Sequence, residues 1–84
     1  MKRVYFSRHV ARRMIERGTT EHEIQQTIRD GRQVPAREGK IAFRLNLRFE
    51  KTWKGKYYGT KQVMVIVSEK PDRYVVITVL TFYF

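Results

Sequence analysis

The sequence predicts an α+β domain in which an N-terminal pair of helices packs on a four-stranded antiparallel sheet. The prediction rests on a change of hydrophobic period, because apolar residues recur at helical spacing before Pro35 and at alternate positions after it. The chain has 84 residues, which suits one domain over 1–84 and is too short for two. Hydrophobic residues make up 42% of the chain, which is enough to build a core and argues against disorder.

Two helices joined by a short turn are predicted in the first third of the chain. Ser7 can cap the first helix, and Gly18 can end it. Thr20 and Glu23 have the spacing of a capping box, so we expect the second helix to begin there and to continue to Gly31. The apolar side of the first helix comprises Val10, Ala11, Met14 and Ile15.

The rest of the chain has the two-residue period of β-structure. Residues 41–50 alternate between apolar and polar types, which predicts a strand with one buried and one polar face. Residues 63–67 are apolar on both faces, which is typical of a central strand. The four expected strands are a short one near 33–37, 41–50, 63–67 and 74–83, and a short extended segment at 4–6 precedes the helices.

The charge is strongly basic and unevenly distributed. The formal net charge is +10, and residues 1–61 carry sixteen Lys and Arg against six acids, whereas 62–84 carry two of each. A surface of this kind attracts polyanions, and RNA is the expected partner. The alternative is a basic surface that serves solubility alone.

The sequence also argues against several classes of protein. It has no cysteine, and its acids are scattered without a carboxylate pair at ligand spacing, so we expect no metal and no cofactor. Its longest apolar run before the C-terminal strand, at 63–67, is far too short to cross a bilayer. We therefore expect a cytoplasmic protein without a membrane contact.

The first helix has a basic side opposite its apolar side. His9, Arg12, Arg13 and Glu16 share one arc of the helix. His9 lies in the first turn, where free N–H groups and the helix dipole favour an anion. The pattern suggests a phosphate site. A solvated helix face with one surface histidine would have the same pattern.

The strand at 41–50 carries two further arginines on its polar face. Arg44 and Arg48 lie four residues apart and therefore on the same side. If the helices cover the apolar face, this polar face stays open to a ligand. The alternative is that the arginine stems only cover hydrophobic surface.

We expect residues 52–61 to form a long connection in which aromatic and basic residues alternate. Aromatic faces stack on unpaired bases while lysines hold the backbone, which suits single-stranded nucleic acid. Alternatively, Trp53 and a tyrosine fold back onto the core. The residues assigned to RNA binding are Arg12, Arg48, Trp53, Lys54, Lys56, Tyr57 and Lys61.

The segment from Ser7 to Thr20 resembles the opening of an uncharacterised family of small bacterial domains. Members begin with a Ser-x-His-Ala-x-x-Arg-Met-x-x-Arg-Gly helix and end in a Val-Ile-Thr-Val-like strand, which would be 76–79 here. This chain departs from the pattern at Val10, where alanine is usual, and at Thr19, where a larger apolar residue is common. By fold, that family is grouped with the barnase/colicin/RelE-like superfamily of metal-independent ribonuclease toxins.

The resemblance implies the same architecture and a cleft lined by His9, Arg13, Arg44 and Thr78. The resulting hypothesis is an endoribonuclease, a toxin or toxin-derived, that cleaves RNA through attack of the 2′-OH. In it His9 is a general acid or base, the two arginines stabilise the phosphoryl charge, and Thr78 positions it.

Two alternatives from other classes stay open. One is a non-catalytic nucleic-acid-binding module on the same scaffold. The other is a protein-interaction module, in which the C-terminal strand pairs with an acidic antitoxin or with a second copy in a homodimer.

Overall fold

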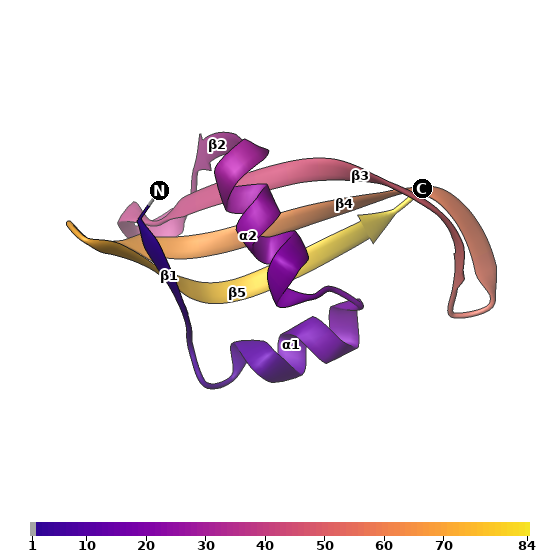
Figure 1. The fold of residues 1–84 in the computed structure, drawn as a ribbon, viewed down its shortest axis with the longest axis horizontal. Helices are drawn as coiled ribbons and strands as arrows, with labels where there is room; N and C mark the ends of the chain where they lie inside the picture. The colour runs from indigo at the N-terminus through magenta and orange to yellow at the C-terminus, as the bar shows by residue number, and fades with distance from the viewer. Residues whose placement is uncertain (1) are drawn as a thin grey trace.

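Two helices cover one face of a five-stranded sheet in the computed structural model of this protein, which describes residues 2–84 (Figure 1). α1 packs against β5, and α2 packs against β3 and β4. The α+β class predicted from the sequence is confirmed. The elements follow one another as β1 (Arg3–Phe6), α1 (Val10–Arg17), α2 (Glu21–Asp30), β2 (Arg32–Pro35), the 3-10 helix η1 (Arg37–Gly39), β3 (Ile41–Trp53), β4 (Lys56–Glu69) and β5 (Arg73–Tyr83).

The sheet is mixed and has the strand order β1-β5-β4-β3-β2. β1 runs parallel to β5, with Phe6 opposite Val76, and the other neighbouring strands are antiparallel. The prediction of four antiparallel strands was therefore wrong, because the extended segment at 4–6 belongs to a fifth strand. Its partner lies near the other end of the chain, and a local pattern contains no information about so distant a pairing.

α1 begins later than the sequence predicts. Ser7 donates its backbone N–H to the carbonyl of Val76, and its own carbonyl accepts from the N–H of Val10. Ser7 is thus the last residue of this segment to bond with β5. The N-cap residue of α1 is His9, whose side chain makes no capping hydrogen bond. The predicted end is confirmed, since Gly18 adopts the left-handed conformation with φ 75°.

The buried stripe of α1 is narrower than its apolar composition suggests. Val10 is fully buried and Met14 packs against the core, but Ala11 is exposed and Ile15 is 81% exposed. α1 contacts mainly one strand, so only residues pointing at β5 are covered.

α2 begins and ends where the sequence predicts. The Thr20 hydroxyl accepts from the N–H of Glu23, and the Glu23 carboxylate accepts from the N–H of Thr20, which confirms the capping box. Ile24 and Ile28 then enter the core. No helix within residues 2–84 is long and apolar enough to cross a membrane. The buried core consists of Val10, Ile24, Ile28, Phe43, Val63, Val65, Val67, Val76 and Val79.

Neither α1 nor α2 covers the second face of the sheet, which we call the open face. Successive strand residues point to opposite faces, so the burial of Phe43, Val63 and Val65 beneath the helices directs Arg44 and Met64 to the other side. The registers extend this assignment across the strands. The open face includes Arg32, Val34, Ala42, Arg44, Asn46, Arg48, Thr60, Gln62, Met64, Ile66, Thr78, Leu80 and Phe82.

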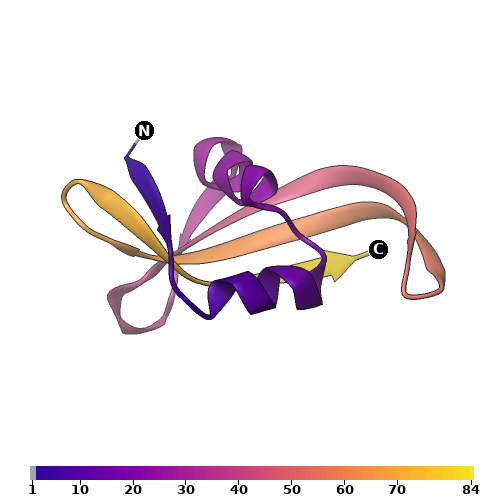
Figure 2. The same ribbon diagram turned by 60° about the horizontal axis from the view of Figure 1, so that its bottom comes forward.

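The segment expected to be a long loop at 52–61 is the tip of a β-hairpin, so that prediction was wrong. β3 and β4 stay paired up to a two-residue turn at Lys54 and Gly55, both with positive φ, as a tight hairpin turn requires. A bulge at Glu50 bends the hairpin, and its tip extends beyond the body of the molecule and curves back (Figure 2). The threonine, tryptophan and tyrosines of this segment are good strand formers, which favours continued pairing over a loop.

Candidate nucleic-acid interface

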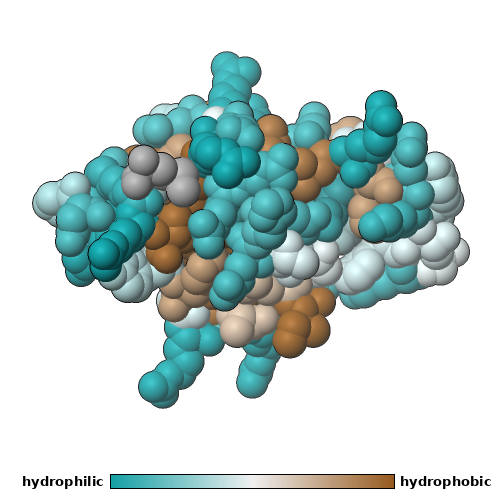
Figure 3. Space-filling view, in the orientation of Figure 1, coloured by the Kyte–Doolittle hydropathy of each residue, from teal (hydrophilic) through white to brown (hydrophobic). Residues whose placement is uncertain are grey.

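The predicted site residues of α1 lie on the outer surface of that helix. His9, Arg12 and Arg13 are all exposed, and Arg13 forms an ion pair with Glu16 at 3.0 Å. Hydrophilic side chains form most of the surface on the side of α2, with smaller hydrophobic areas between them (Figure 3). α1 thus presents basic residues to solvent, and one of its two predicted arginines is already partly neutralised.

The other predicted residues, Arg44, Arg48 and Thr78, lie on the open face. Arg44 and Arg48 come from β3, and Thr78 comes from β5, where it is in register with Ile66 of β4. The structure therefore brings these three onto one surface and leaves His9 and Arg13 on the helix-covered side. The single cleft expected to contain all four catalytic candidates is divided by the sheet.

Arg44 has a second arginine directly beside it. Arg32 of β2 is its cross-strand partner, so two guanidinium groups lie on adjacent strands of the same face. Like charges in directly opposite positions destabilise a sheet. Within residues 2–84, neither Arg32, Arg44 nor Arg48 forms an ion pair with an acid. The open face thus carries a cationic cluster that has no compensating ion pair among the described residues. Arg32 was not among the site residues predicted from the sequence.

A hollow of about 520 Å³ opens beside this cluster, and Arg32, Arg44, Asn46 and Gln62 contribute to its lining. The hollow contains one acid, Asp30, but Arg29 holds both of its carboxylate oxygens at 3.1 Å. This hydrogen bonding and charge raise the pKa of Arg29. Because Asp30 is already neutralised, the local charge at the hollow stays positive.

The neighbouring part of the open face is apolar. A second hollow of about 500 Å³ lies between β2, η1 and the sheet, and its floor includes Ala42, Met64 and Ile66. Arg37 and Lys40 also line it. The open face is therefore a surface with a cationic end and an apolar end, rather than a uniformly solvated one.

Trp53 was assigned to base stacking, but its ring is engaged within the protein. It stacks on Tyr83 with centroids 5.2 Å apart and planes at 17°, and Phe49 and Tyr58 also contact Tyr83. An added Cβ on Gly18 would lie 2.6 Å from the Trp53 ring. The bent hairpin thus packs against the end of α1, as the alternative interpretation of Trp53 had it.

The other hairpin residues remain on the surface. Tyr57 is 63% exposed, and Lys54 and Lys56 are exposed as well. Each lysine lies over an aromatic ring, Lys54 over Trp53 at 5.4 Å and Lys56 over Tyr58 at 5.6 Å. These residues stay available for a phosphate backbone, although they lie away from the hollow beside Arg44.

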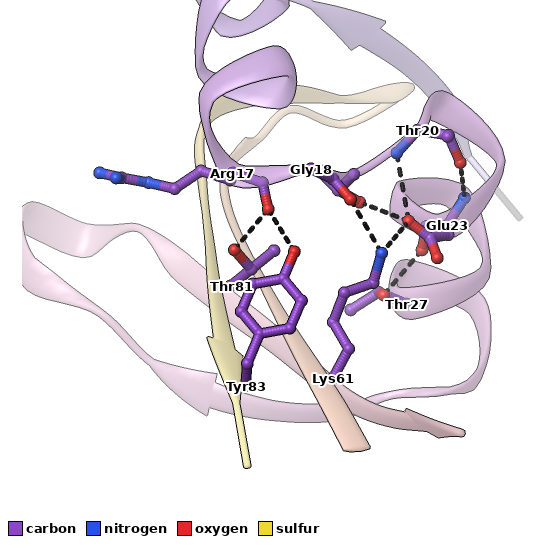
Figure 4. Close-up of polar contacts among 9 residues, drawn as sticks. Arg17, Gly18, Thr20, Glu23, Thr27, Lys61, Thr81 and Tyr83 are labelled. Carbon is purple, nitrogen blue, oxygen red and sulfur yellow. Dashed lines mark hydrogen bonds and ion pairs between the residues drawn. The ribbon is translucent and has the colours of Figure 1, made fainter. Parts of the chain in front are cut away.

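Lys61 requires a correction, because it is only 4% exposed. Its Nζ donates to the Glu23 carboxylate and to the carbonyl of Gly18, both at 2.9 Å (Figure 4). It also lies 5.3 Å from the centre of the Phe49 ring. A lysine in a period-two strand points to one of two faces, and Lys61 points under the helices. It fastens the turn between α1 and α2 to the sheet and is not accessible to RNA in this arrangement.

Tyr83 belongs to the same internal network. Its hydroxyl and that of Thr81 both donate to the carbonyl of Arg17 at 2.7 Å (Figure 4). These bonds satisfy a backbone carbonyl at the C-terminal end of α1 that has no partner within the helix. Burial raises the pKa of Tyr83, the charge of Glu23 raises it further, and the nearby Thr81 hydroxyl opposes the shift. These contacts hold the C-terminal end of α1 and the following turn against the sheet, and we call them the joint around Lys61.

A family model described as a domain of unknown function, DUF4258, matches residues 6–81. The chain belongs to the DUF4258 family. No curated protein and no solved structure matches it.

The match to DUF4258 spans both helices and most of the sheet, so it includes the cationic cluster and the joint around Lys61. Within residues 2–84 of this DUF4258 domain, no three side chains of His, Asp or Glu lie together as metal ligands would. Four further residues of the open face were not among the predicted site residues: Asn46, Gln62, Phe82 and Phe84. The alternation of residues 41–50 could have identified Asn46, because it occupies one of the polar positions. The positions of the other residues depend on how the strands pair.

Proposed function

We propose that this chain is an RNA-binding domain and that the open face of its sheet is the contact surface. The observation that carries the proposal is the cross-strand pair of Arg32 and Arg44, which has no acidic partner within residues 2–84 and adjoins a hollow. A phosphate between the two guanidinium groups would replace their repulsion with charge-assisted hydrogen bonds.

The rest of the open face supports a polyanion rather than a single small anion. Arg48 lies two residues beyond Asn46 on the same strand and face, so the cations follow β3 instead of forming one point. The Ser7–Thr20 segment resembles a family that is grouped by fold with the barnase/colicin/RelE-like superfamily, and that grouping favours RNA as the polyanion. A net charge of +10 adds a long-range attraction.

We propose binding without cleavage by the predicted catalytic set. Cleavage through attack of the 2′-OH needs an acid or base and a cation around one phosphate. His9 belongs to α1 and Arg44 to the open face, so one phosphate does not meet both. Within residues 2–84, the His9 side chain also forms no hydrogen bond with a carboxylate or another group that would orient the ring.

The binding proposal is tested by two matched double variants. Arg44→Ala with Arg48→Ala removes two arginines from the open face, and Arg8→Ala with Arg12→Ala, the helix-side variant, removes two exposed arginines, one just before α1 and one in it. None of these four arginines forms an ion pair within residues 2–84. Fluorescence anisotropy with a labelled RNA measures affinity over a salt series. We expect the first variant to lose about tenfold or more in affinity, and its salt slope to fall by about 0.7 to 0.9 for each arginine.

The helix-side variant lowers the net charge equally, so it separates contact from general attraction. We expect it to stay close to the wild type in affinity. Equal losses in both variants, or no binding of RNA by the wild type, would overturn the assignment of the open face.

The absence of cleavage is tested separately. RNA incubated with the protein in a chelator is expected to stay intact at high protein concentration. Cleavage that yields a cyclic phosphate and disappears in His9→Ala would restore the endoribonuclease hypothesis.

A further inference from the structure

Two phenylalanine rings, at the C-terminal end of β5 and just beyond it, share the open face with its arginines. Phe82 is in register with Gln62, which is in register with Asn46. Phe84 exchanges two backbone hydrogen bonds with Thr60, at 2.8 and 3.0 Å, and Thr60 is opposite Arg48. Each ring therefore lies in a cross-strand row that ends on β3.

These two rings are exposed, as are those of Tyr5 and Tyr57 in other parts of the sheet. Phe82 is 44% exposed and Phe84 is 61% exposed. Phe43, Phe49, Trp53, Tyr58, Tyr74 and Tyr83 all contact another ring, whereas in the described part of the chain Phe82 and Phe84 contact none. Two apolar rings thus lie open on the face that also carries the uncompensated cations.

We infer that the open face binds single-stranded RNA, with one base stacked on Phe82 and another on Phe84. This inference rests on the proposed function and identifies the form of RNA that the same site takes. A base offers its flat face for stacking only when it is unpaired, and an aromatic ring on an open sheet is a suitable platform for it. The two rings are about 7 Å apart along the strand, which leaves room for a base on each.

The polar residues of the same rows complete the surface. Arg48 lies across β4 from Phe84 and can hold the phosphate next to a stacked base. Gln62 donates its side-chain N–H to Asn46 at 2.9 Å, which leaves the Gln62 oxygen and the Asn46 amide nitrogen free for base edges. The site therefore combines stacking, charge and amide groups across three strands. Both phenylalanines lie beyond residues 6–81, so the inference concerns this chain rather than its whole family.

The test compares three probes on the Phe82→Leu and Phe84→Leu double variant. The probes are a single-stranded RNA of about 12 nucleotides, the duplex of that strand with its complement, and linear polyphosphate, which has charge but no bases. Leucine keeps an apolar side chain and removes the flat ring. We expect about tenfold or greater loss of affinity for the single strand and no change for polyphosphate. The wild type is expected to bind the single strand more tightly than the duplex.

Tyr5→Leu is the matched control. Tyr5 is 47% exposed, close to Phe82, and its register with Val75 puts it about 20 Å from Phe82 along the sheet. We expect its affinity for all three probes to equal that of the wild type. Thermal unfolding of each variant checks the fold, and Phe84→Leu alone, at the more exposed ring, gives the same test with less effect on packing.

The outcomes separate this inference from the proposed function. Unchanged single-strand affinity in the double variant, or equal affinity of the wild type for single strand and duplex, overturns stacking but leaves arginine-dependent binding in place. If the wild type binds no RNA, either single-stranded or duplex, the proposed function itself is overturned. A concentration-dependent dimer in light scattering that disappears in the double variant would assign the rings to a second copy of the chain and overturn the inference.

Discussion

Lys61 and Arg44 lie on neighbouring strands of one sheet but on its opposite faces. Lys61 is buried beneath the helices, where the Glu23 carboxylate and the Gly18 carbonyl satisfy it at 2.9 Å. Arg44 lies on the open face beside Arg32 and has no acidic partner within residues 2–84. One cation is paired inside the fold, and the other has no acidic partner in the described part of the chain, which is why we propose it for a ligand.

The aromatic residues of the same two faces differ in the same way. Trp53 and Tyr83 stack on each other against the end of α1, whereas Phe82, one residue before Tyr83, is exposed on the other side. From residue type alone, each of these aromatic residues could contact a ligand. The comparison shows that the face of the sheet decides whether a basic or aromatic side chain is structural, and the following predictions test that rule.

The largest effect is expected from Glu23→Ala. The change leaves the buried ammonium of Lys61 without its counter-charge, and breaking a buried pair in this way costs about 3–5 kcal/mol of unfolding free energy. Urea denaturation measures the loss, while RNA affinity of the folded protein should not change. Glu21→Ala, an exposed acid in the same helical turn, is the control and should cost less than about 1 kcal/mol. Similar losses in both variants would show that Lys61 does not depend on Glu23.

Gly18→Ala is expected to cost about 2–4 kcal/mol, because it combines a strained left-handed alanine with a clash against Trp53. Gly39→Ala is a matched control, since Gly39 has a similar positive φ of 71° and nothing within 4 Å of an added Cβ. The control should lose only about 1–2 kcal/mol, so the difference between the two reports the packing of the hairpin tip on α1. Equal losses would mean that Trp53 is free to move away and to serve as a ligand.

Tyr83→Phe removes one hydrogen bond to the Arg17 carbonyl and should cost about 1 kcal/mol at neutral pH. Because the folded-state pKa of Tyr83 is raised above its unfolded value, the contribution of the neutral phenol is complete below that unfolded value, about 10. It is then lost as the pH rises through the folded-state pKa. Urea denaturation at increasing alkaline pH should therefore show a steeper loss in the wild type than in the variant, and parallel curves would contradict the burial of this hydroxyl.

The smallest effect is expected from Arg32→Glu, and its sign is the informative part. Replacing a like-charge neighbour of Arg44 by an opposite charge should raise the unfolding free energy by about 0.2–1 kcal/mol. The same change should weaken RNA binding, as measured by anisotropy. Arg32→Gln, which removes the repulsion without adding attraction, should fall between the two proteins in both measurements. A loss of stability in both variants would mean that Arg32 already has a structural role.

The signals that predicted structure correctly were short and local. The capping box of Thr20 and Glu23 and the left-handed Gly18 involve residues within one turn of each other, so the chain around them contains the whole cause. The alternation in β3 likewise assigned Arg44 and Arg48 to one face. Each of these features follows from backbone geometry that neighbouring residues impose on one another.

The features that the sequence left open depend on distant partners. Lys61 could be recognised as buried only once Glu23 was known to lie above it, and Phe82 as exposed only once α1 was known to cover the other face. The expected long loop at 52–61 continued as paired strand because the two halves of the hairpin satisfy each other's backbone groups. The separation of His9 from Arg44 is also a matter of layers, which no spacing along the chain encodes.

By itself, then, the sequence determined the α+β class, the C-terminal ends of both helices, the start of α2 at Thr20 and the two different faces of β3. The tertiary structure alone decided the parallel fifth strand, the burial of Lys61 and Trp53, and the meeting of Arg32, Arg44 and the phenylalanines on one face. The reason is physical: a cap or an alternating pattern lowers the energy through neighbours in the chain, whereas burial and charge compensation are determined by whichever element packs on top.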